Sequence, residues 1–212
     1  LAHDPTPIDF SALPLDPRIR IGIADRGFTR TTPIQSAVFP VVFEGADLIA
    51  CAETGTGKTA AFLLPIMQRL LSRPASVPGT RVLVLEPTRE LAVQIEDDFQ
   101  GFAYHTTLTS VVVYGGVDAD IQTRGLKAGA DLVVATPGRL QDLMNCGAAD
   151  FTRLEVLVLD EADRMMDMGF WPDVSRIVAT LPTARQTLLF SATTSSDVVR
   201  MADEIMHNPK HV

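Results

Sequence analysis

Short runs of apolar residues recur along the chain, each of a length typical of a β-strand. Within the runs the apolar residues are nearly continuous, a pattern that favours strands of a parallel sheet buried on both faces. Helical stretches separate most of the runs, which predicts right-handed crossovers. The fold class is therefore α/β, with a largely parallel central sheet flanked by helices on both faces. The expected strands are residues 48–51, 81–86, 109–114, 131–135, 154–160 and 186–191.

The most specific local pattern lies between residues 47 and 64, where a Gly-rich turn joins an expected strand to an expected helix. Gly55 and Gly57 allow backbone N–H groups to turn inward around phosphate oxygens, and a helix beginning near Lys58 adds its positive dipole end. Lys58 can then reach the β and γ phosphates, and the Thr59 hydroxyl can bind Mg²⁺. The strict pattern has Gly where this chain has Ala52. The turn is thus predicted to be a phosphate-binding loop.

A second motif follows the expected strand 154–160, which ends in Asp160 and Glu161. Strand ends of a parallel sheet lie at one edge, so Asp160 is expected beside the phosphate loop, where it can hold Mg²⁺, usually through a water. Glu161 is then positioned to orient or deprotonate the water that attacks the γ-phosphate. Carboxylates at strand ends are common, but together with Lys58 and Thr59 they indicate nucleotide hydrolysis.

Two other expected strands are followed by Thr, Pro and Arg where a helix begins, at residues 87–89 and 136–139. Thr136 is suited to cap the helix and Pro137 to be its first residue. Free N–H groups and an Arg suit a sugar-phosphate backbone, although an ordinary capped helix has the same pattern. The pair Gly115-Gly116 permits either a close backbone approach or a plain turn.

Two more polar sites each have a local and a functional interpretation. Ser191 and Thr193 end the last expected strand with hydroxyls that can hydrogen-bond Asp163, or that can simply cap the next helix. Gln35 carries a donor and an acceptor on one amide, which matches the N6 and N7 edge of adenine. After a Pro turn, however, Gln is more often a helix-capping or surface residue.

Composition narrows the class of protein. At 212 residues with 46% hydrophobic content, the chain is expected to form one large domain. The formal net charge of −8 restricts any nucleic-acid contact to a local surface. Cys51 and Cys146 have no metal-ligand spacing, and Cys51 lies on an expected buried strand, so a reducing, cytoplasmic location is predicted. The start has no secretory pattern, no apolar stretch is long enough to cross a membrane, and the absence of an initial Met suggests a processed or excised chain.

With these residues in hand, the chain resembles the DEAD-box ATP-dependent RNA helicases, in particular their first, N-terminal RecA-like lobe. The resemblance covers nearly the whole chain and rests on motifs in the family's order. These are Gly27-Phe28, Pro33-Ile34-Gln35, residues 52–59, residues 87–92, Gly115-Gly116, residues 136–139, residues 160–163 and Ser191-Ala192-Thr193. It implies an adenine-recognition lead-in at 1–45, a RecA-like ATP-binding domain at 46–207 that forms one domain with the lead-in, and the start of an interlobe linker at 208–212.

The resemblance also implies ligands and residue roles. ATP or ADP, Mg²⁺ and RNA would be bound, and a second RecA-like lobe would complete the intact enzyme. The nucleotide would contact Phe28, Gln35, Thr54, Gly55, Thr56, Gly57, Lys58 and Thr59, with Phe10 nearby; Glu161, Lys58 and Asp160 would be catalytic; Thr59 and Asp160 would hold Mg²⁺. RNA would contact Pro87, Thr88, Arg89, Gly115, Gly116, Thr136, Gly138 and Arg139, and Asp163, Ser191 and Thr193 would couple nucleotide state to unwinding.

Departures and alternatives remain at this point. Family members often have Pro at the Thr31 position and Gln at the Glu53 position. Nothing after Ser195 resembles the second lobe and its arginine finger, so the chain alone, expected to be monomeric, should turn ATP over poorly. A DNA translocase lobe and a non-catalytic RNA-binding module are the alternatives. A GTPase is excluded because neither asparagine, Asn145 or Asn208, lies in a guanine-reading Asn-Lys-x-Asp segment.

Overall fold

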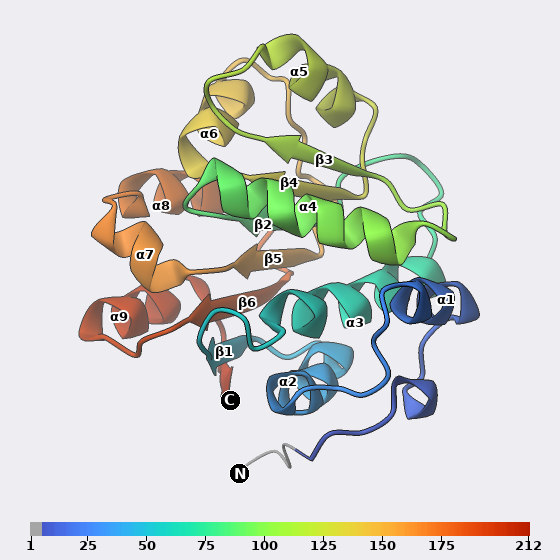
Figure 1. Ribbon diagram of the computed structural model, residues 1–212. Coiled ribbons are helices and arrows are strands. Elements are labelled where there is room, and N and C mark those ends of the chain that lie inside the picture. The colour runs from blue at the N-terminus through green and yellow to red at the C-terminus, as the bar shows by residue number, and fades with distance from the viewer. Residues whose placement is uncertain (1–5) are drawn as a thin grey trace.

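The structure is a computed structural model that describes residues 6–212. The described residues form a seven-stranded sheet in the order β3-β4-β2-β5-β6-β1-β7, and every pair of neighbouring strands is parallel (Figure 1). The predicted α/β class and parallel sheet are therefore confirmed. The strands are β1 (Leu48–Cys51), β2 (Val82–Leu85), β3 (Ser110–Val113), β4 (Leu132–Ala135), β5 (Val156–Leu159), β6 (Gln186–Ser191) and β7 (Lys210–His211).

Helices cover both faces of the sheet, as the continuous apolar strands predict. Helices α1 to α4 pack on one face and α6 to α9 on the other. The helical elements are η1 (Phe10–Ala12), α1 (Pro17–Asp25), α2 (Pro33–Glu44), α3 (Lys58–Ser72), α4 (Arg89–Ala103), α5 (Ala119–Lys127), α6 (Pro137–Asn145), α7 (Ala162–Asp167), α8 (Trp171–Thr180) and α9 (Ser196–Ile205).

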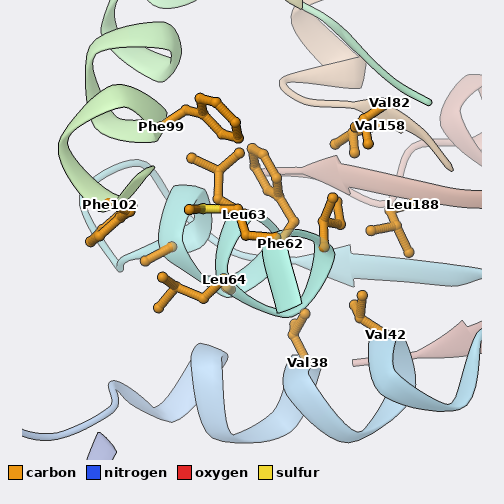
Figure 2. Close-up of a cluster of buried hydrophobic side chains, with 14 of the residues drawn as sticks. Val38, Val42, Phe62, Leu63, Leu64, Val82, Phe99, Phe102, Val158 and Leu188 are labelled. Carbon is orange, nitrogen blue, oxygen red and sulfur yellow. The ribbon is translucent and has the colours of Figure 1, made fainter. Parts of the chain in front are cut away.

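The helix that follows the phosphate loop, α3, is the centre of the first face. Phe62 of this helix is fully buried and lies 5.3 Å from the ring of Phe190 on β6, measured between ring centroids. In Figure 2, Phe62, Leu63 and Leu64 of α3 lie near Val38 and Val42 of α2, and Val82, Val158 and Leu188 of the strands belong to the same buried cluster. Because most residues of α3 are tightly packed, the helix cannot shift, and Lys58 at its start is held in place.

Strand register brings two acidic residues to the same edge. Leu85 of β2 pairs with Leu159 of β5, so the next residues, Glu86 and Asp160, leave neighbouring strands side by side. The Asp160 N–H donates to the Leu85 carbonyl at 3.2 Å, which continues the ladder past the last strand residues. Because side chains alternate between faces, both carboxyl groups point to the face covered by α3.

Two expectations need correction or extension. Cys51 lies on β1 as predicted, but its side chain is exposed because it is the last residue of the strand. Lys210 and His211 form β7, which pairs with β1 at the sheet edge, a strand that the sequence pattern did not reveal. The assignment of 208–212 to the start of a linker stays a prediction. Across residues 6–212, no helix combines the length and apolar character needed to span a bilayer.

Candidate nucleotide-binding site

The predicted phosphate loop joins β1 to α3 in the structure. Gly55 and Gly57 have φ values of 81° and 93°, a left-handed conformation that favours glycine. A Cβ atom at Gly57 would lie 2.6 Å from Nε2 of Gln35, so this position also requires a residue without a side chain. Lys58 is the first residue of α3, at the positive end of the helix dipole. The loop therefore has the backbone that binding of phosphate requires.

Lys58 faces the carboxylate that follows β5. Its Nζ atom lies 3.5 Å from Oδ1 of Asp160, and the two side chains are only 6% and 7% exposed. Nζ makes no hydrogen bond within the described residues, although it can donate three. Burial raises the pKa of Asp160 above its usual value, while the charge of Lys58 opposes this rise. The sequence prediction that these two groups lie together agrees with this geometry.

Glu161 adopts an unusual backbone conformation at the start of α7. Its φ and ψ angles are 49° and 48°, in the left-handed region that non-glycine residues rarely occupy. Its N–H donates to Oδ1 of Asp160 at 2.8 Å, and its carboxylate accepts from Nη1 of Arg164 at 3.0 Å. Such strain persists where the surrounding structure imposes it, often at functional sites.

A third carboxyl group, which sequence reasoning did not single out, lies beside this pair. Glu86 is 0% exposed, and neither of its carboxyl oxygens has a hydrogen-bond partner in the part of the chain that the structure describes. Burial, followed by the charges of Asp160 and Glu161, raises its pKa well above the ordinary value. In the sequence Glu86 was only the last residue of an expected strand; the signal available was a charged residue ending a run expected to be buried.

One cavity of about 400 Å³ connects these groups to the predicted adenine site. Phe28 is 44% exposed, and its ring centroid lies 6.1 Å from that of Phe102. Phe10 is buried against Phe39 and does not line this cavity. The lining includes Phe28, Gln35, Thr54, Gly55, Gly57, Lys58, Thr59, Glu86, Asp160 and Glu161. Thr56 is not in the lining, and its hydroxyl donates to the Glu53 carbonyl at 2.8 Å.

Gln35 connects the lead-in to the phosphate loop. Its Oε1 accepts from the Thr32 N–H at 2.9 Å, which forms the N-terminal cap of α2, and its Nε2 donates to the Gly57 carbonyl at 3.0 Å. The capping interpretation is therefore confirmed. Because both ends of the amide are occupied, an adenine contact by Gln35 would have to share these groups or replace the bonds.

The predicted RNA-binding residues gather where β2, β3 and β4 end. Thr88 caps α4, and the guanidinium of Arg89 lies over the ring of Tyr114, 4.7 Å from its centroid. Thr136 occupies the cap position of α6 without a side-chain hydrogen bond, and Pro137 is the first helical residue, as predicted. Nη1 of Arg139 donates to the Val117 carbonyl at 3.1 Å.

The remaining residues of this edge differ in access. A Cβ atom added at Gly115, Gly116 or Gly138 would have no neighbour within 4 Å, so the backbone there is open to a ligand. Pro87 is buried, so its ring is not on the surface. The edge is thus an open surface with accessible backbone and two arginines, and not a closed cavity.

Of the two hydroxyls at the end of β6 that were predicted to hydrogen-bond Asp163, only that of Thr193 does so. Thr193 Oγ1 donates to Oδ2 of Asp163 at 3.1 Å. The Ser191 hydroxyl instead accepts from the Thr193 N–H at 3.3 Å, and the structure records no bond from it to Asp163. Ser191 therefore positions Thr193, and Thr193 contacts the acid.

A Gly-rich loop between a parallel strand and a helix, with its Lys held against a strand-end Asp, defines a P-loop nucleotide-binding domain of the α/β class. The family model for DEAD/DEAH box helicases matches residues 32–201. The chain belongs to this family.

Individual relatives agree with the assignment. An ATP-dependent RNA helicase DRS1 from Phaeosphaeria nodorum is 47% identical over 201 residues, which is 94% of this chain and 25% of that protein. An ATP-dependent RNA helicase RhlB from Xanthomonas oryzae pv. oryzae is 45% identical over 212 residues, which is 97% of this chain and 37% of that protein. The chain thus spans about a quarter to just over a third of these relatives.

A solved structure agrees as well. The crystal structure of a DEAD box protein from the hyperthermophile Methanococcus jannaschii has a TM-score of 0.88 and 33% sequence identity. The match covers 96% of this chain and 55% of that one. The expectation of a RecA-like fold is thereby confirmed.

Proposed function

We propose that the chain is the nucleotide-binding lobe of an ATP-dependent RNA helicase, which couples ATP binding and hydrolysis to RNA unwinding or remodelling. The observation that carries the proposal is the buried pair of Lys58 and Asp160 at the wall of one cavity, with Thr59 beside them. The Lys58 ammonium can donate three hydrogen bonds and makes none within the described residues, its contact with Asp160 being 3.5 Å long, so a phosphate group would satisfy its N–H donors.

The oxygen donors of this cavity fit a hard divalent cation. Mg²⁺ keeps several waters and takes few protein ligands, which suits the hydroxyl of Thr59 and the carboxylate of Asp160. In residues 6–212 no group of three or more His, Cys, Asp and Glu side chains is arranged to hold a metal. When bound with the nucleotide, Mg²⁺ would neutralise the charge that develops on the phosphates.

The chain's own groups then divide the work. The loop amides and Lys58 bind and orient the phosphates, and Glu161 accepts a proton from the attacking water. The ion pair with Arg164 holds the Glu161 carboxylate at 3.0 Å and must leave one of its oxygens free for this role. The half-exposed ring of Phe28 offers a stacking surface for adenine at the other end of the cavity.

RNA would bind along the edge formed by the ends of β2 to β4. Arg89 and Arg139 offer charge, and the helix starts at Thr88 and Thr136 offer N–H groups to phosphates and sugars. The bond between Thr193 and Asp163 would link this edge to the nucleotide. A second RecA-like lobe would supply an arginine finger, worth about 10³ to 10⁵ in rate in related phosphoryl transfer.

Turnover of ATP by a chain carrying both lobes tests this proposal. Single-stranded RNA should stimulate turnover and DNA should not; equal stimulation by both would favour the DNA translocase. Turnover that neither nucleic acid nor the second lobe raises would favour a binding module without catalysis. We also propose a monomer in the cytoplasm, the location being supported by two cysteines that form no disulfide, Cys51 and Cys146.

A further inference from the structure

Glu86 is the buried titratable group that the proposed mechanism leaves unused. It follows β2, while the acidic pair Asp160 and Glu161 follows β5, the neighbouring strand. Its carboxyl group is completely buried and lines the same cavity as Lys58 and Thr59. A buried carboxyl group without a hydrogen-bond partner costs stability. This cost is the physical reason to expect a ligand that supplies the missing partner.

Charge counting points to the kind of ligand. Around the phosphate end the chain places the carboxyl groups of Glu86, Asp160 and Glu161. Glu161 is paired with Arg164, and Asp160 with Lys58. Glu86 has neither an ion pair nor a hydrogen bond in the described residues, and like charges on neighbouring strands repel each other. The missing partner is therefore a cation, or hydrogen-bond donors held by a cation.

The arrangement also indicates that Glu86 contacts that cation through water molecules. The acidic side chains here do not form a direct metal-ligand group within the described residues. A hydrated Mg²⁺ ion, however, carries water molecules whose O–H groups donate strongly to carboxylate oxygens. Glu86 follows the strand next to that of Asp160, and both of its carboxyl oxygens are free to accept hydrogen bonds from such waters.

We propose that Glu86 is a third carboxyl group of the nucleotide site, which accepts hydrogen bonds from the water shell of the divalent cation bound with the nucleotide. This inference rests on the proposed function. Glu86 is a positioning residue, because it acts on the cation through water. It makes nucleotide affinity more dependent on the divalent cation, because its carboxyl oxygens accept hydrogen bonds from the waters of the metal complex and have no such donors to accept from when bare phosphates bind.

Binding of a fluorescent ADP analogue to the 212-residue chain tests the inference without requiring turnover. The affinity is measured in chelator and over a series of Mg²⁺ concentrations for the wild type, Glu86→Gln and Glu86→Asp. Glu86→Gln keeps the shape and replaces one acceptor oxygen by an NH₂ group, which cannot accept a hydrogen bond. We expect the enhancement of binding by Mg²⁺ to be about three- to tenfold smaller in Glu86→Gln than in the wild type, because the amide offers the hydrated cation one acceptor oxygen instead of two. Glu86→Asp, which keeps the charge with a shorter reach, should retain part of the enhancement.

The matched control is Asp203→Asn, which removes one negative charge from the exposed side of α9. An unchanged Mg²⁺ enhancement in Glu86→Gln would overturn the inference, as would an equal change in Asp203→Asn, which would show that net charge is responsible. Circular dichroism and thermal unfolding establish that each variant is folded; if Glu86→Gln does not fold, an enhancement in Glu86→Asp equal to that of the wild type overturns the inference.

The two levels of proposal fail differently. If the wild-type chain binds no analogue even with Mg²⁺, the proposed nucleotide site is wrong and this inference falls with it. If the wild type binds and Mg²⁺ strengthens binding equally in every variant, the nucleotide site stands and only the role of Glu86 is wrong.

Discussion

The nucleotide cavity and the proposed RNA edge lie along the same row of strand ends, yet they are built in opposite ways. At the cavity, the side chains of Lys58, Asp160 and Glu86 are all buried. At the RNA edge, Arg89 is exposed and rests on an aromatic ring, and Arg139 is held by a single backbone carbonyl. The cavity holds buried charges in a fixed geometry, whereas the arginines of the edge are more accessible to solvent.

The difference predicts how sensitive each region is to substitution. Removing one member of a buried charge pair leaves the other unpaired and costs several kcal/mol, about 2–5 in measured cases. Removing an exposed phosphate contact costs far less, because water replaces it and other contacts remain. Substitutions should therefore have large effects at the cavity and small, additive effects at the edge.

The largest effect is expected at Glu161, in a chain that carries both lobes. Glu161→Gln removes the proton acceptor while keeping the side-chain shape, so hydrolysis should fall by about 10²- to 10⁴-fold. Nucleotide affinity should stay within a few-fold, because the phosphate contacts remain. Single-turnover hydrolysis together with binding of an ATP analogue measures both. Turnover at the wild-type rate would refute the role of Glu161, and Asp167→Asn, at the end of the same helix, is the matched control.

Lys58 is expected to have the next largest effect. Lys58→Ala removes the buried ammonium from the phosphates and from Asp160, so ADP affinity should fall by about 2–5 kcal/mol. Calorimetry on the 212-residue chain measures the loss, with Lys127→Ala at the end of α5 as a control that removes the same charge elsewhere. Equal ADP binding by Lys58→Ala and the wild type would show that the buried charge of the cavity does not hold the nucleotide.

The same contrast explains how much the sequence could predict. The placement of Lys58 beside Asp160 could be predicted, because a Gly-rich turn fixes the backbone of the loop and the parallel strands bring both residues to one edge of the sheet. The role of Gln35 in capping α2 was one of two open interpretations, and only the positions of Thr32 and Gly57 resolved it.

What the sequence did not reveal depends on distant contacts. Glu86 became notable only once the register between β2 and β5 set it beside Asp160. Strand β7 has two residues, too few for any periodicity, and exists because β1 leaves an edge to pair with. Cys51 is exposed because strand burial ends one residue earlier than the apolar run suggests.

At the RNA edge, Arg139 provides a test of the exposed region. Arg139→Ala in a chain with both lobes should weaken RNA binding by a few-fold, uniformly across sequences, and lower the salt slope by about one. Fluorescence anisotropy at several salt concentrations measures both quantities. If Arg139→Ala lost as much RNA affinity as Lys58→Ala loses ADP affinity, the edge would depend on one dominant contact and not on many small ones. Arg176→Ala, an exposed arginine on α8, controls for net charge.

The smallest effect is expected at Thr193, which we propose couples the two regions through its hydrogen bond to Asp163. Thr193→Val removes the hydroxyl that donates to Asp163 while keeping the branched shape, and one such bond is worth about 0.5–1.5 kcal/mol. Because neither Thr193 nor Asp163 lines the cavity or belongs to the proposed RNA-binding residues, ADP affinity and RNA affinity measured separately should each stay unchanged. The coupling between them, measured as the change in RNA affinity caused by an ATP analogue, should fall by about two- to thirteenfold, which is that bond energy expressed as an affinity ratio. If the coupling persists in Thr193→Val, the buried cavity and the exposed edge communicate through other residues; if RNA affinity alone falls, Thr193 belongs to the edge itself and not to the link.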